Sequence, residues 1–332
     1  MTTTNDKTEL TNLQVLRAVA AMMVVLYHAM ETGRAYGFPV RSLGFLEGWG
    51  GHGVDLFFVI SGFIMVYIQA MAARSPARFF ANRVRRIVPL YWVLTLLAAA
   101  VHLALPRLVN HGAAEPGFVA ASLAFLAQPL YGAMPVLYLG WSLEFEMLFY
   151  LVFAACIALP SLNAAVLAAC GAVAAWAFIG GNMLPLEFAL GMAAGWLYVN
   201  RRIGAAAGKP MLALGAALLL ATVAFKAAAL DRVLMYGLPS VLLVAGCAVL
   251  PQVPRGVWTR AGDASYSIYL VQVFSVSAFY KAARAAGLPA ALGDVLAFAC
   301  LAATALAGWL LYRAVERPLA ARRQPRPRPS AA

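Results

Sequence analysis

The fold of this chain is decided by residues 13–30, which read LQVLRAVAAMMVVLYHAM. This largely apolar run is long enough to cross a bilayer as a helix, yet it contains Arg17 and His28. At 3.6 residues per turn, the two side chains lie about three turns apart on one face, roughly 16 Å along the axis. A charge within a spanning helix is costly unless it faces protein or water, so we expect both residues to face a bundle interior. In the alternative interpretation, Arg17 extends to the inner lipid head groups and His28 lies in the outer interface.

The composition of the chain indicates an all-α, polytopic membrane protein. Hydrophobic residues make up 63% of its 332 residues and charged residues 11%, which is more apolar surface than a soluble core of this size needs. The formal net charge is +12, but the basic residues cluster in short connectors between apolar runs. That distribution is typical of membrane topology, so we expect no nucleic acid partner. The four cysteines lie in apolar stretches without metal-ligand spacing, so no metal site is predicted.

The apolar runs predict about ten transmembrane helices, with both termini in the cytoplasm. The stretch 118–131 is apolar but short for a span, and we expect it to be re-entrant or interfacial. Ten spans place 17 Lys and Arg residues on the inner side and six on the outer side. An eleventh span would put the arginine-rich tail outside, contrary to the positive-inside rule. The predicted spans are about 12–30, 54–72, 88–105, 142–159, 162–179, 183–199, 211–229, 234–250, 264–283 and 290–312.

The chain divides into three predicted regions and carries no cleavable signal in its polar N-terminus. Residues 1–11 form a cytoplasmic segment, residues 12–316 form the membrane domain, and residues 317–332 form a basic, proline-rich tail. The tail is expected to be extended and to lie near anionic lipid of the inner leaflet.

The polar residues near the spans fall into two layers. Arg17 lies at the inner face with Arg83 and Arg86, which share a helical face if their run RFFANRVRRIVPLYW is helical. Further out lie imidazole and carboxylate groups: His28, Asp55 and Glu146. This order suits a long anionic donor whose phosphates bind the arginines while its reactive end reaches the histidine. Ordinary positive-inside topology is the alternative explanation for the arginines.

Each carboxylate has more than one interpretation. Asp55 either caps the start of its helix or accepts a hydrogen bond from His28, which would leave the other ring nitrogen free to act as a base. Glu144 and Glu146 diverge by about 200° on a helix, so only one of them is expected to face a pocket. Glu187 begins a span on the outer side and either joins the pocket or caps its helix.

The motifs of the chain resemble those of the acyltransferase family 3 membrane proteins, and most closely the branch involved in exopolysaccharide production. The resemblance runs from residue 13 to about residue 318. Its matching pieces are LQVLRAVAAMMVVLYHA, GVDLFFVISGF, FFANRVRRIVPLYW, WSLEFEMLFY, LPLEFALG, GDASYSIYLVQ and YRAVERP.

The resemblance implies an O-acyltransferase that uses an acyl-CoA, usually acetyl-CoA, from the cytosol. By position, His28 matches the catalytic histidine and Arg17 its paired arginine. Arg83 and Arg86 match the motif near the donor, and Glu146 matches the glutamate of the tryptophan-led motif. The implied acceptor is a hydroxyl of a cell-surface or exported polysaccharide or of a lipid-linked saccharide. The donor is a substrate, and no bound cofactor is expected.

The same resemblance supplies further expectations. Trp141, Glu144, Glu187 and Tyr266 lie in the matching motifs as possible pocket residues. Family members often carry His where this chain has Gln272, so that position is not expected to hold the base. The extracytoplasmic hydrolase-like domain common in the family is missing, so the chain would complete transfer alone or pass the acyl group to a partner. The expected location is the bacterial cytoplasmic membrane, with lipid and polysaccharide-assembly proteins as partners.

Three functions follow from these observations. In the first, an O-acyltransferase uses His28, oriented by Asp55, as a general base or as a transient acyl carrier. In the second, a transporter or flippase moves a lipid-linked sugar and needs intramembrane charges for that reason. In the third, the chain is a non-catalytic subunit of a polysaccharide-assembly complex.

Overall fold

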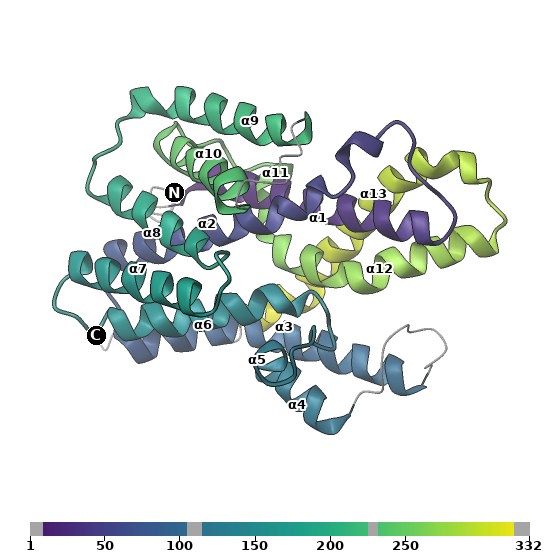
Figure 1. Ribbon diagram of the computed structural model, residues 1–332, viewed down its shortest axis with the longest axis horizontal. Helices are drawn as coiled ribbons and strands as arrows, with labels where there is room; N and C mark the ends of the chain where they lie inside the picture. The colour runs from purple at the N-terminus through teal and green to yellow at the C-terminus, as the bar shows by residue number, and fades with distance from the viewer. Residues whose placement is uncertain (1–8, 105–114, 225–231, 322–332) are drawn as a thin grey trace, which may run out of the picture.

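The computed structural model describes residues 9–104, 115–224 and 232–321, and its regular secondary structure there is entirely helical (Figure 1). The α-helices are α1 (Thr11–Ala35), α2 (Gly53–Met71), α3 (Pro76–Ala104), α4 (Pro116–Leu123), α5 (Ala127–Tyr131), α6 (Gly140–Cys156), α7 (Leu162–Ile179), α8 (Leu186–Val199), α9 (Gly208–Ala224), α10 (Leu238–Val249), α11 (Val257–Asp263), α12 (Ser265–Ala285), α13 (Gly293–Leu311) and α14 (Arg317–Ala321). Short π-helical turns, η5 (Val233–Gly237) and η7 (Tyr312–Glu316), precede α10 and follow α13.

Six helical segments within the described residues are long and apolar enough to cross a membrane. They are Thr11–Ala35, Trp49–Met71, Pro76–Ala104, Leu162–Ile179, Ala205–Ala224 and Ala290–Leu319, and Leu186–Val199 and Val233–Val249 are shorter apolar helices. The predicted class, an all-α membrane protein with several spans, is confirmed. Each of the ten predicted spans contains a helix, but the count of ten and the cytoplasmic termini stay predictions. The predicted tail begins with α14, and its residues from 322 on lie outside the described residues, as do residues 1–8.

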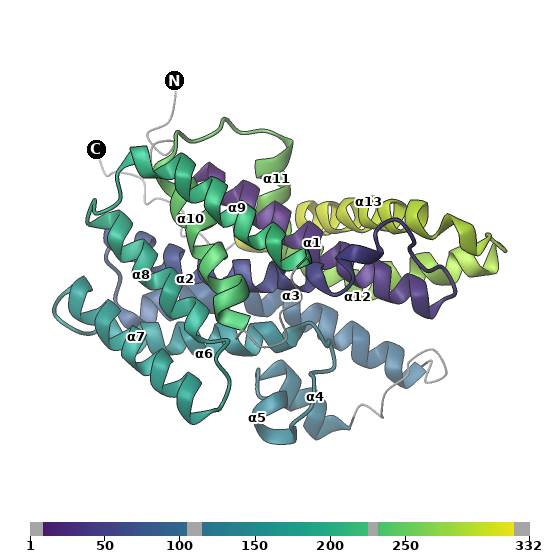
Figure 2. The same ribbon diagram turned by 45° about the horizontal axis from the view of Figure 1, so that its top comes forward.

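The stretch 118–131 forms the two short helices α4 and α5, neither of which can span a bilayer. The turn between them contains Phe125 in the left-handed region, with a φ of 61°. Both helices lie on the side of α3 away from α9 and α10 (Figures 1 and 2). Tyr91 and Trp92 of α3 hold α4, because their side chains donate hydrogen bonds to the carbonyls of Ser122 and Leu123, each at 2.9 Å.

Helices α1 and α2 lie at the centre of the molecule. α1 packs against α2, α11, α12 and α13, and α2 packs most extensively against α8. In both ribbon views α12 and α13 extend along one half of α1, whereas α6, α7 and α8 gather at the opposite end (Figures 1 and 2). The α2–α8 approach depends on glycine: a Cβ at Gly62 would lie 2.2 Å from the Phe188 carbonyl oxygen, and one at Gly191 would lie 2.2 Å from that of Val59. Small residues at such contacts are typical of membrane helices, since packing rather than the hydrophobic effect joins the helices in lipid.

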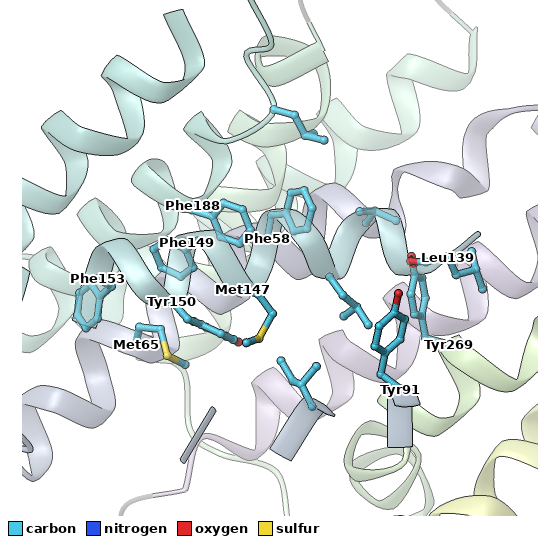
Figure 3. Packing of buried hydrophobic residues seen from close by; sticks show 14 of the residues in the cluster. Phe58, Met65, Tyr91, Leu139, Met147, Phe149, Tyr150, Phe153, Phe188 and Tyr269 are labelled. Atoms are coloured by element: carbon cyan, nitrogen blue, oxygen red, sulfur yellow. The ribbon is translucent and has the colours of Figure 1, made fainter. Parts of the chain in front are cut away.

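Aromatic side chains fill the core between α2, α6 and α8. Phe188 stacks on Phe58 and on Phe149, with ring centroids 4.4 Å apart in both pairs. Phe153 continues this wall toward the end of α6, whereas Tyr269 and Leu139 lie at the other end of the cluster (Figure 3). Close-packed rings of this kind hold α2 and α6 in one arrangement, and both helices present polar side chains to the cavity described next.

Candidate active site

An internal cavity of about 100 Å³ lies between α1, α2, α3, α6 and α12. Its wall brings together residues from five separate parts of the chain, including five of the ten predicted site residues: Arg17, Arg83, Arg86, Glu146 and Tyr266. Its polar lining consists of Arg17, Ser61, Arg83, Arg86, Ser142, Glu146, Tyr150, Ser265, Tyr266 and Tyr269. Three arginines, one glutamate and several hydroxyls inside an apolar bundle are the features of a site that binds a charged or polar ligand.

The three arginines come from two helices. α1 supplies Arg17, and α3 supplies Arg83 and Arg86, one helical turn apart, as predicted from their spacing. Arg17 interacts electrostatically with Arg86 and with the carboxylates of Glu146 and Glu316. Among these charged groups three positive charges face two negative ones, so this part of the cavity has an excess positive charge available to an anion.

Two hydrogen-bonding groups at the cavity lack partners within the described part of the chain. They are the buried Arg83 Nε and the buried Ser265 Oγ. Buried polar atoms in native proteins are usually paired, so an unpaired N–H beside a surplus of positive charge fits a ligand that brings anionic oxygens.

Glu146 is the glutamate of α6 that faces the cavity. Its Oε1 accepts hydrogen bonds from Ser61 of α2 at 2.7 Å and from Tyr150, one turn along α6, at 2.5 Å. These two donors hold the carboxylate in one orientation near Arg17. Of the two glutamates in WSLEFEMLFY, this one therefore matches the predicted pocket position.

Glu144 does not line this cavity. Its two carboxylate oxygens accept hydrogen bonds from the backbone N–H groups of Ala127 at 2.9 Å and Gln128 at 3.1 Å. These amides begin α5, where a carboxylate is favoured by the unpaired N–H groups and the helix dipole. Trp141 does not line the cavity either, since its ring packs edge-on against Phe58 with centroids 6.4 Å apart. The two side chains lie on faces of α6 that turn away from this cavity, and Glu144 lines a separate pocket with Gln128.

Asp55 is fully buried, and its partner is not His28. Arg232 donates Nε–H to Oδ1 and Nη2–H to Oδ2, both at 2.7 Å, while His52 Nδ1 lies 3.4 Å from Oδ2. The predicted hydrogen bond between Asp55 and His28 is thus replaced by a two-point ion pair, which is much stronger than a bond to a neutral imidazole. The cavity-facing side of α2 is formed instead by Val54, Phe57, Phe58 and Ser61.

Glu187 belongs to the same buried cluster as Asp55 and does not line the cavity. It is fully buried at the start of α8, and its side chain interacts with that of Asp55. The expectation that Glu187 joins the pocket is therefore corrected, since its partners are Asp55 and the neighbouring Arg232.

His28 lies beyond the cavity on α1 and is not one of its lining residues. Its Nδ1 is 2.9 Å from the carbonyl oxygen of Val24, so the Nδ1–H donates to that carbonyl and Nε2 keeps its lone pair. The ring contacts Tyr27 and Tyr138, with centroid distances of 4.8 and 5.6 Å, and Gln272 interacts with it from α12. The Val24 carbonyl, one helical turn earlier, thus fixes the His28 tautomer. Asp55 was expected to play this part.

Several residues in or beside the cavity were missed in the sequence. Glu316 accepts a hydrogen bond from Ser267 at 2.5 Å and interacts electrostatically with Arg17 and Arg86. Tyr269 lies three residues after the predicted Tyr266, and Tyr150 four residues after Glu146, which are spacings that place side chains on one helical face. That spacing was the signal available for the two tyrosines, whereas Ser61 and Glu316 lie in the matching motifs GVDLFFVISGF and YRAVERP.

The fold and the cavity define an integral membrane protein with a polar site inside its helical bundle. The sequence profile of acyltransferase family 3, described as an acyltransferase domain, matches residues 10–314. The chain belongs to this family, which confirms the resemblance seen in its motifs. It is also 39% identical to the exopolysaccharide production protein ExoZ of Rhizobium meliloti (strain 1021) over 304 residues, covering 81% of this chain and 89% of that protein. No solved structure matches the chain. Family membership supports the acyltransferase hypothesis over the transporter and the non-catalytic subunit.

Proposed function

We propose that this protein transfers an acetyl group from acetyl-CoA, used on the cytosolic side, to a hydroxyl of an exported or cell-surface polysaccharide. The acyltransferase class follows from the family. The polysaccharide acceptor is suggested by the name of the relative, which refers to exopolysaccharide production. The proposed location is the bacterial cytoplasmic membrane, where a cytosolic donor and an exported acceptor meet on opposite sides of one protein.

The unpaired Arg83 Nε beside Arg17 and Arg86 is the observation that carries this proposal. CoA carries several phosphate groups, and guanidinium N–H groups are the side-chain donors best matched to phosphate oxygens. Arg17 and Arg86 repel each other electrostatically in the absence of an anion. A bound phosphate would relieve that repulsion and supply the partner that Arg83 lacks.

The size of the cavity supports a small acyl group. Its volume is about 100 Å³. Cavities that enclose drug-sized ligands measure roughly 300–1,000 Å³, so this one would enclose a group the size of acetyl but not a whole CoA. The nucleotide end of the donor would therefore stay outside, next to the arginines.

His28 is the proposed base. In the neutral ring its Nε2 carries the lone pair, because Nδ1–H donates to Val24. In the simplest reaction Nε2 takes the proton of the acceptor hydroxyl, the oxygen attacks the thioester carbon, the C–S bond breaks, and the CoA thiolate leaves. If His28 instead carries the acyl group, the same Nε2 attacks first and the acceptor oxygen later displaces it.

Purified protein supplied with acetyl-CoA labelled in the acetyl group tests the proposal. Acetylation of a polysaccharide acceptor, or hydrolysis of the donor, is expected from the wild type and not from His28→Ala protein present in equal amount. Absence of both reactions in folded wild-type protein with all substrates present would overturn the proposal. Rapid quenching and peptide mass analysis would separate the two mechanisms, since only the second leaves an acetyl group on His28.

A further inference from the structure

A pair of hydroxyl groups closes the end of the cavity that leads toward His28. Tyr269 and Ser142 both line the cavity, and their oxygens lie 2.8 Å apart. Each hydroxyl also lies 3.2 Å from the carbonyl oxygen of Leu139. Both side chains are 5% exposed, so the pair is buried but still reaches the cavity surface. Figure 3 shows Tyr269 beside Leu139 at the end of the aromatic cluster opposite Phe153.

Two connections join this hydroxyl pair to His28. Tyr138 precedes Leu139 in the chain, and its ring contacts the ring of His28 at 5.6 Å. On the other side, Gln272 interacts with His28 and donates its Nε2–H to the Tyr269 carbonyl at 2.8 Å. The residues that contact His28 are therefore neighbours of the two hydroxyls in the cavity wall.

The other hydroxyls of the cavity wall are differently placed. Ser61 and Tyr150 donate to Glu146, and Tyr266 donates to the carbonyl of Ile87 at 2.7 Å. Ser265 lies one turn nearer the start of α12 than Tyr269. The hydroxyls that the described structure offers at the end next to His28 are thus those of Tyr269 and Ser142.

The hydrogen bonds of the pair allow a ligand oxygen to be accommodated. The two hydroxyls make three contacts: one with each other and one each with the Leu139 carbonyl oxygen. Only two protons are available for these three contacts, so one contact is without a proton at any moment. Each O–H can therefore turn from the Leu139 carbonyl toward a ligand oxygen that enters the cavity. Neutral donors in a buried site are well suited to an oxygen that gains negative charge during a reaction, since they need no reorganisation of solvent.

We propose that Tyr269 and Ser142 bind the carbonyl oxygen of the acyl thioester and stabilise the negative charge that develops on it. This inference rests on the proposed function. As the acceptor oxygen, or His28 Nε2, bonds to the carbonyl carbon, the electron pair of the C=O bond moves to the carbonyl oxygen. The two hydroxyls donate hydrogen bonds to that oxygen. The C=O bond then re-forms, the C–S bond breaks, and the thiolate leaves.

The Tyr269→Phe variant tests this role, because it removes one hydroxyl and keeps the ring. Loss of one such donor typically lowers kcat about 100- to 1,000-fold, and the KM for acetyl-CoA should stay within about threefold because the arginines still bind the phosphates. Ser142→Ala should lower kcat in the same way. Tyr280→Phe is the matched control on the same helix. The Tyr280 hydroxyl is buried without a partner in the described structure and lies outside the cavity, so the kcat of this variant should match that of the wild type.

Wild-type protein is assayed beside the variants, so that failure of the proposed acetyltransferase function can be distinguished from failure of the proposed carbonyl site. If the wild type is active and Tyr269→Phe retains its kcat, or raises only KM, the carbonyl site is wrong and the proposed function stands. If the wild type itself neither hydrolyses nor transfers, the proposed function fails first. Should Tyr269→Phe not reach the membrane, Ser142→Ala decides alone, and a wild-type kcat in that variant would overturn the inference.

Discussion

Asp55 and Arg232, which are 177 residues apart in the sequence, form a buried two-point ion pair with both N–O distances at 2.7 Å. The pair ties the first turn of α2 to the residue that precedes η5. The Asp55 carboxylate is 0% exposed, whereas the Arg232 side chain is 41% exposed. The acidic partner is therefore the one that depends on the contact, since it has no access to water.

Removal of Arg232 should destabilise the protein without acting on the chemistry. Breaking a buried pair from one side costs about 3–5 kcal/mol, and Arg232→Ala should fall at or below the lower end of this range because water can reach part of the site. Thermal unfolding of detergent-solubilised protein would measure the loss. Arg284→Ala, at an exposed position near the end of α12, is the control and should unfold like the wild type.

Asp55→Asn should likewise lower stability and leave kcat per folded molecule within about threefold of the wild type, because His28 takes its orientation from Val24. A kcat at least 100-fold lower at wild-type abundance would contradict this expectation, since a loss of that size is typical of general-base chemistry. Such a result would restore a catalytic role for Asp55.

Arg83→Ala and Arg86→Ala should weaken use of the donor. A charge-assisted bond to phosphate contributes about 1.5–3 kcal/mol, which corresponds to a rise in the KM for acetyl-CoA of about 10- to 150-fold. Arg85→Ala removes the same charge from the same connector without touching the cavity wall. Equal effects from all three variants would mean that the arginines serve membrane topology alone.

His28→Ala should lower acyl transfer about 100- to 10,000-fold at unchanged abundance, because a positioned base is lost. His102→Ala offers a close control: its Nδ1 lies 2.7 Å from the carbonyl of Ala98, the same contact with the residue four positions back, but it is not a cavity residue. Acetylation of the acceptor, measured by mass analysis, should be normal in the control. Transfer by His28→Ala within about threefold of the wild type would rule out the base.

The two glutamates of α6 should behave differently. Glu146→Gln keeps the shape of the side chain that Ser61 and Tyr150 hold but removes the negative charge near Arg17 at the cavity, so it should lower kcat/KM more than stability. Glu144→Gln keeps an acceptor oxygen for the start of α5 and should reduce stability more than catalysis. A reversed pattern would show that the assignment of the two carboxylates is mistaken.

The predicted orientation of the tail can be tested with reporter fusions. Alkaline phosphatase fused after Gln324 should be inactive, because the reporter folds only outside the cytoplasm and the basic tail is predicted to stay inside. A fusion after Gly287, between α12 and α13, should be active as the matched outer position. Activity at Gln324 would contradict the ten-span topology.

The membrane class, the positions of the helices and the family could all be predicted from the amino-acid sequence. These features depend on composition, on the length of apolar runs and on motifs within about 20 residues, all of which are local. The shared helical face of Arg83 and Arg86 and the divergence of Glu144 from Glu146 also follow from helical periodicity alone. Periodicity could not say which glutamate faces inward, since that depends on where α5 and α2 pack.

The partners of the buried charges could not be predicted from the sequence, because they depend on how the helices pack. Asp55 pairs with Arg232 because the packing of α2 against α8 and η5 brings a distant guanidinium within 2.7 Å, whereas His28 lies on another side of the bundle and uses its own backbone. The same packing places Tyr269 and Ser142, 127 residues apart, in contact at the end of the cavity. Such contacts join residues far apart in the chain, and no local pattern carries their distance, because side-chain partners in a bundle are set by which helix faces meet.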